Sequence, residues 1–122
     1  MVMSNEGKSL TFTAGGAITA GQLVALHTDD KVYASTHWSA DKVVGIALTT
    51  VTASDISNGN DKVAVATEGV FTLTDSGSGI AAGTQFEAVD ADTIRTVASA
   101  KALGTALATI SASGTGSCLI RI

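Results

Sequence analysis

The sequence predicts an all-β fold, namely a small barrel or sandwich built from two related halves with at most one or two short helical turns. First, the segment Gly45-Ile-Ala-Leu-Thr-Thr-Val-Thr-Ala-Ser-Asp55 recurs 59 residues later as Gly104-Thr-Ala-Leu-Ala-Thr-Ile-Ser-Ala-Ser-Gly114. Second, roughly ten short apolar segments alternate with turns at the spacing typical of sandwiches and barrels. Third, the 122 residues include 13 Gly and no Pro, so glycine and Asn/Asp turns separate the strands.

The repeat extends upstream of the Gly45 segment. Ile18-Thr-Ala-Gly21 recurs as Ile80-Ala-Ala-Gly83, and the turn at Asp29-Asp30-Lys31-Val32 matches Ala91-Asp92-Thr93-Ile94, in both cases 62 residues later. Because the two copies of the Gly45 segment are apolar on both faces, we expect them to be paired central strands of one duplicated domain.

The domain boundaries follow from this repeat. Residues 1–8 lack apolar periodicity and are predicted to form a flexible N-terminal arm. Residues 9–122 are predicted to form a single β-domain with pseudo-repeats of about 9–75 and 76–122, joined at the flexible Ser76-Gly-Ser-Gly79.

The individual strands are read from alternation, as in Ser9-Leu-Thr-Phe-Thr13, where Leu10 and Phe12 share a face. The same reading predicts strands at residues 9–13, 22–27, 32–33, 43–52, 62–67, 69–74, 85–89, 93–97, 104–110 and 117–122. Asn58-Gly59 predicts a hairpin turn. Single helical turns are expected within residues 35–42 and 98–103.

Composition and charge narrow the range of partners. The net charge is −4 and the seven Lys and Arg are scattered, so we expect no direct nucleic-acid contact. No apolar run approaches the ~20 residues of a membrane helix, so no membrane association is expected. The single Cys118 suits synthesis in a reducing cytoplasm.

Catalytic candidates are few, and each has a simpler structural explanation. Cys118 alternates with Ile120 and Ile122, which is typical of a small buried hydrophobe rather than a nucleophile. His27 ends a strand and His37 lies in a polar loop, so both are expected at the surface or at an interface. We therefore predict that the protein is not an enzyme.

Metal and cofactor sites are also not expected. Asp55, Asn58, Asn60 and Asp61 place four oxygen-bearing side chains close together, but their order does not match a calcium-binding loop. Gly77-Ser-Gly79 lacks the Lys-Ser/Thr of a phosphate-binding loop. A carrier domain modified at Lys31 is the remaining cofactor hypothesis, although the residues beside Lys31 do not match those of biotinyl or lipoyl carriers.

The chain resembles the small capsid cement, or head-decoration, proteins of tailed bacteriophages. The segments that carry the resemblance are strand and turn patterns that span about residues 6–122. They are Glu6-Gly-Lys-Ser-Leu-Thr-Phe-Thr, Ile18-Thr-Ala-Gly21, Val44-Gly-Ile-Ala-Leu48 and Val63-Ala-Val-Ala-Thr-Glu-Gly-Val-Phe-Thr-Leu73.

The resemblance implies a non-enzymatic virion protein on the outer surface of the mature phage head. There it would cement contacts between major capsid protein subunits, commonly as a homotrimer. The alternative is another structural β-module, such as a tail, spike or surface-layer domain. The residues expected to contact the capsid are Val2, Met3, Ser4, Asn5, Glu6, Gly7, Lys8, Ser9 and Leu10, whose backbone could add a strand to a capsid-protein sheet, with Trp38 as a further anchor.

Overall fold

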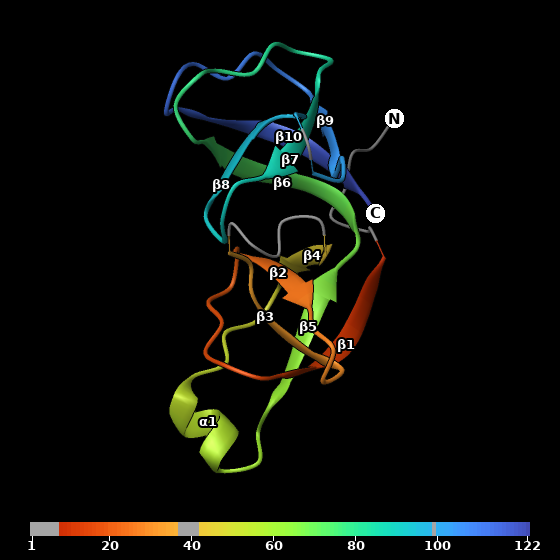
Figure 1. The fold of residues 1–122 in the computed structure, drawn as a ribbon, viewed down its shortest axis with the longest axis vertical. Coiled ribbons are helices and arrows are strands. Elements are labelled where there is room, and N and C mark those ends of the chain that lie inside the picture. Colours follow the sequence, from red (N-terminus) through yellow and green to blue (C-terminus); the bar gives the residue numbers. More distant parts are fainter. Residues whose placement is uncertain (1–7, 37–41, 99) are drawn as a thin grey trace.

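The chain folds into two closed five-stranded β-barrels placed one above the other (Figure 1). The computed structural model describes residues 8–36, 42–98 and 100–122. The first barrel comprises β1 (Ser9–Ala14), β2 (Leu23–Leu26), β3 (Lys31–Ala34), β4 (Val43–Ala47) and β5 (Lys62–Ala66). The second comprises β6 (Glu68–Asp75), β7 (Gln85–Ala88), β8 (Thr93–Thr96), β9 (Gly104–Ala106) and β10 (Thr115–Arg121). The predicted all-β fold of two related halves is confirmed.

The two barrels repeat one strand order. The first closes in the order β1-β3-β2-β4-β5, and the second follows the same cyclic order from β6 through β8, β7 and β9 to β10. In each barrel one pair is parallel, β1 with β3 and β6 with β8, and the other pairs are antiparallel. Duplication is therefore visible in the topology as well as in the sequence.

Hydrogen bonds outside the strands repeat as well. Isolated bridges join Ile18 to Val51 in the first barrel and Ile80 to Ile110 in the second. Beside each bridge, a threonine hydroxyl accepts a hydrogen bond from the backbone of the glycine corner. The two bonds run from Ala20 N to Thr50 Oγ1 (3.0 Å) and from Ala82 N to Thr109 Oγ1 (3.3 Å).

The glycines that open the repeated segment are explained by close backbone packing. A Cβ at Gly45 would overlap the carbonyl oxygen of Ala66 on β5, and a Cβ at Gly104 would overlap that of Leu119 on β10. Because the obstacle is a neighbouring backbone, only glycine fits at this position of either barrel.

The predicted pairing between the two Gly45-type segments is wrong. β4 pairs with β2 and β5, and β9 pairs with β7 and β10, because each repeat closes on itself. The boundary between the two barrels also lies earlier in the chain than the predicted joint at Ser76-Gly-Ser-Gly79. β6 belongs to the second barrel, and the chain passes between the barrels at Thr67.

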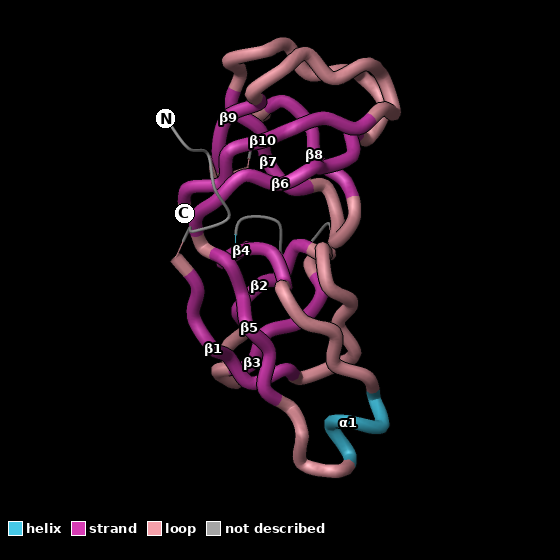
Figure 2. Tube along the Cα trace, turned by 180° about the vertical axis from the view of Figure 1, so that it is seen from behind, coloured by secondary structure: helices cyan, strands magenta, loops and turns pink. Residues whose placement is uncertain are grey.

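The helix lies elsewhere than predicted. Asn58-Gly59 does not form a two-residue hairpin, because residues 53–57 form a short helix, α1 (Ala53–Ser57), at the end of the first barrel (Figure 2). Thr52 and Asp55 form a capping box at its start, and Asn58 caps its end. The helical turn expected within residues 98–103 is absent from the described residues there, and the turn expected within 35–42 falls largely outside them.

The barrels have separate interiors but share one junction. Inside the first barrel lies a cluster of Ala14, Ile18, Val24, Val32, Ala47, Val51, Val63 and Val65. The core of the second barrel is continuous with four residues on β2 and β4 of the first, namely Leu23, Ala25, Val43 and Ile46. A backbone hydrogen bond from Leu23 N to Ala91 O (2.8 Å) also crosses the junction.

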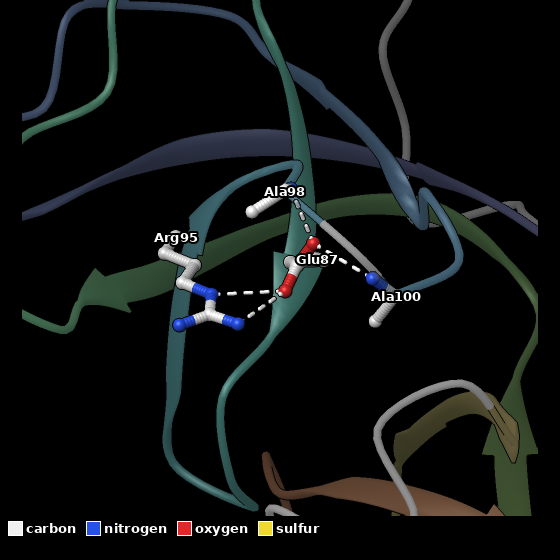
Figure 3. A network of polar contacts seen from close by, with 4 residues as sticks. All are labelled: Glu87, Arg95, Ala98 and Ala100. Carbon is white, nitrogen blue, oxygen red and sulfur yellow. Dashed lines mark hydrogen bonds and ion pairs between the residues drawn. The ribbon is translucent and has the colours of Figure 1, made fainter.

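The segment after β8 is held by a buried carboxylate. Glu87 on β7 is fully buried, forms an ion pair with Arg95 on β8 (2.9 Å), and accepts hydrogen bonds from the backbone N–H groups of Ala98 and Ala100 (Figure 3). These bonds fix the backbone at residues 98 and 100 beside β7, and no helical turn forms over the described residues between 98 and 103.

Candidate interaction surface

The predicted contact residues divide into two groups. Val2, Met3, Ser4, Asn5, Glu6, Gly7 and Trp38 lie outside the described residues. Lys8, Ser9 and Leu10 lie where β1 begins, and all three are exposed, with Leu10 at 57 % the most exposed large hydrophobic residue of the described chain.

The start of β1 and the end of the chain meet at the barrel junction. The carbonyl oxygen of Lys8 accepts hydrogen bonds from the backbone N–H groups of Thr67 (2.8 Å) and Glu68 (3.4 Å). The carbonyl oxygen of Thr67 accepts one from the N–H of Ile122 (3.0 Å). Lys8, predicted as the last residue of a flexible arm, is therefore fixed at the junction, beside the C-terminus (Figure 1).

A groove of about 350 Å³ opens between the barrels at this place. One wall comes from the first barrel and the other from β6. The lining residues are Ser9, Leu48, Ala66, Glu68, Val70, Phe71 and Thr72. The lining of the groove thus combines apolar side chains with one carboxylate, that of Glu68.

One strongly exposed large apolar side chain lines this groove. It is Leu48, which is 44 % exposed, whereas Leu10 and Ile122 are also exposed but are not among the lining residues. Leu107, the counterpart of Leu48 in the second repeat, is also 44 % exposed but does not line this groove. An exposed leucine in a partly apolar groove is typical of a protein interface.

The catalytic candidates hold structural positions. Cys118 is buried, as predicted, and burial raises its thiol pKa to about 11, so the thiol is uncharged at neutral pH. His27 is partly buried and packs on the Tyr33 ring at 4.3 Å, and the Tyr33 hydroxyl donates to Asp29 (2.6 Å). His37 lies outside the described residues.

The acidic residues serve as caps. The Asp55 carboxylate forms the capping box with Thr52. The hydrogen bond that it accepts from the Thr52 backbone N–H lowers the pKa of Asp55. Asp75 is buried, which would raise its pKa, but backbone N–H groups of Gly79, Ser113 and Gly77 outweigh burial and lower it. Within the described part of the chain, no group of three or more His, Cys, Asp or Glu could hold a metal ion.

Several groove residues were not predicted from the sequence. Leu48 lies in the predicted apolar central strand 43–52 and Val70 in the predicted strand 69–74, and neither prediction indicates a groove. The pairing of Thr67 with Lys8 is long-range, so no local pattern indicated the groove. Leu10 is exposed although its alternation with Phe12 suggests an inward face, and its predicted role as a capsid contact came from the resemblance alone.

The fold and the site define a duplicated-barrel protein with an apolar groove where its barrels meet. The chain belongs to the phage cement protein family, whose model matches residues 4–122. This membership gives the protein a structural role in the phage capsid and confirms the family resemblance. A comparison with curated proteins finds no match. No helix in the described ranges is long and apolar enough to cross a membrane.

Proposed function

We propose that the protein binds the outer surface of the mature phage head and cements contacts between major capsid protein subunits. The observation that carries this proposal is the family match over residues 4–122. The surface at the barrel junction supports it, because the exposed Leu48 lines a groove there together with Val70 and Phe71. Many copies on one particle would make modest individual contacts sufficient for attachment.

We further propose that residues 1–7 and Trp38 contribute contacts and that the protein acts as a homotrimer. Lys8 supports the role of the N-terminal residues, because its hydrogen bonds to Thr67 and Glu68 bring the start of β1 to the groove. An N-terminal segment that leaves the described fold at this point would reach a capsid bound to the same side.

The test is co-sedimentation of the purified protein with expanded and with immature heads of the phage that encodes it. The proposal predicts saturable binding to expanded heads and weak binding to immature ones. Removal of residues 1–7 leaves Lys8 in place and is expected to weaken binding strongly, and Trp38→Ala is expected to weaken it less. Absence of binding to expanded heads would refute the proposed function, whereas full binding by the shortened chain would refute the role of residues 1–7.

A further inference from the structure

The junction groove continues beyond Thr72 into a second depression of about 330 Å³. Its walls come from the glycine corner of the first barrel, from β6 and from the β7–β8 turn. The lining residues are Thr19, Ala20, Gly21, Gln22, Thr72, Leu73, Thr74 and Asp92. Because Thr72 lines both depressions, they form one trough along β6 between the barrels, which we call the β6 trough.

The dimensions of the β6 trough fit an extended peptide. Its lining residues on β6 run from Glu68 to Thr74, six steps of ~3.3 Å each, or roughly 20 Å. An extended segment of about six residues has the same length. The described strands close into barrels without a free edge, so such a segment would be recognised by side chains rather than by strand addition.

The charge of the β6 trough points to a basic occupant. Glu68 lies at one end and Asp92 at the other, and no Lys or Arg of the described ranges lines either depression. Among the described residues, the ion pairs are Lys62–Asp61 and Arg95–Glu87, so Glu68 and Asp92 form none, although Arg121 lies opposite Glu68 in the β10–β6 pairing. Asp92 accepts a 3.4 Å hydrogen bond from Gln22 Nε2.

The β6 trough is more apolar at one end than at the other. Leu48, Val70 and Phe71 line the depression that contains Glu68, whereas threonines, Gln22 and Asp92 dominate the other. The occupant should therefore carry an aliphatic or aromatic side chain near one end and basic side chains near both ends.

We propose that the β6 trough binds an extended, positively charged segment of the major capsid protein, with an apolar side chain packed beside Leu48. This inference rests on the proposed function and deepens it, because it names the surface of this chain and the chemistry of the partner segment. A second copy of this chain is the competing occupant, which the experiments below distinguish.

The first experiment removes the two trough charges. Glu68→Gln/Asp92→Asn is expected to raise the half-saturating concentration on expanded heads about threefold to tenfold, and added salt should narrow the difference from the unmodified protein. The matched control is Asp30→Asn, which alters an exposed turn residue outside the trough and should leave binding unchanged. Equal binding by the double variant and the control would overturn the inference while leaving the proposed function intact. Failure of the unmodified protein to bind would instead refute the proposed function.

The second experiment identifies the occupant. A photo-crosslinking amino acid replaces the exposed Thr72, where the two depressions meet, and a matched probe replaces the exposed Ser57 on α1. On decorated heads, the Thr72 probe should link to a Lys- or Arg-containing segment of the major capsid protein, and the Ser57 probe should not link to that segment. Crosslinks from Thr72 to a second copy of this chain, or no crosslink on heads that are decorated, would overturn the inference.

Discussion

The two barrels share one strand order but differ in the polarity of the outward-facing side chains on two equivalent pairs of strands. In these pairs, β2 corresponds to β7 and β4 corresponds to β9. In the first barrel these positions are apolar and packed against the core of the second barrel. In the second barrel the counterparts are polar. The matched pairs are Leu23 and Gln85, Ala25 and Glu87, and Ile46 and Thr105.

This difference shows how two repeats of one fold come to have different surfaces. The outward face of β2 and β4 is covered by the second barrel, whereas the same face of β7 and β9 carries polar residues. Glu87 lies there, satisfied by Arg95 and by the segment after β8. The residues that the two repeats share therefore form the common barrel fold. The residues that differ between the repeats determine what each surface contacts.

The largest expected effect tests what the barrels have in common. Gly45→Ala and Gly104→Ala should each destabilise the protein by about 3–5 kcal/mol, because the added Cβ would overlap the carbonyl oxygen of Ala66 or Leu119. The measurement is chemical denaturation. The control is Gly16→Ala, because a Cβ there lies at an ordinary 3.5 Å from the Tyr33 ring. Tolerance of alanine at either repeated glycine would contradict the equivalence of the barrels.

A second prediction replaces Glu87 by alanine, the residue type of its counterpart Ala25 in the first barrel. Glu87→Ala should cost about 2–3 kcal/mol of unfolding free energy, because it leaves the N–H groups of Ala98 and Ala100 without their acceptor and Arg95 without its partner. Denaturation together with amide exchange at residues 98 and 100 measures it. A neutral substitution would show that the carboxylate does not hold this segment.

A third prediction concerns interior volume. The first barrel carries Val63 and Val51 where the second carries Gly116 and Ile110, and a Cβ at Gly116 would lie 2.6 Å from Ile110 Cγ1. Gly116→Ala should therefore destabilise the protein by about 1–3 kcal/mol through overpacking. When Ile110→Ala is added, the combined loss should be smaller than the sum of the two single losses. Strictly additive losses would mean that the two positions do not compensate each other.

The smallest expected effect is confined to acid pH. The pKa of Asp75 is lowered in the folded protein, so its contribution to stability is present above the unfolded-state pKa of about 3.9 and is lost as the pH falls through the folded value. Unfolding measured against pH should show Asp75→Asn losing part of this acid dependence. The first barrel carries Ala14 at this position. An unchanged acid profile would contradict the role of Asp75.

The sequence predicted the local features of the fold well. Alternation located the strands to within a few residues, and the repeat of Ile18-Thr-Ala-Gly21 predicted two equivalent corners. It did not predict that each repeat closes on itself, because strand pairing depends on contacts distant in sequence. At Asn58-Gly59 a helical capping box prevailed over the hairpin signal, and the spacing of Thr52 and Asp55 could have indicated this.

The predicted capsid contacts remain a prediction. The expectation of contacts at Ser9 and Leu10 came from the resemblance and the unrepeated N-terminus, and Ser9 lies in the lining of the junction groove. The groove depends on Leu48 and β6, which the fold brings to Ser9 from distant parts of the chain. Whether a repeated leucine lies in a groove or on an open face cannot be read from its segment, since Leu48 and Leu107 have nearly the same neighbours in sequence.

The most direct test of the central claim compares these two leucines. Leu48→Ser and Leu107→Ser remove the same side chain from the same repeat position at the same 44 % exposure, but only Leu48 lines the junction groove. The binding surface proposed here predicts that Leu48→Ser raises the half-saturating concentration on expanded heads about fivefold to tenfold, whereas Leu107→Ser leaves it unchanged. Equal effects of the two substitutions, or a larger effect at Leu107, would contradict the claim that the protein binds through its barrel junction.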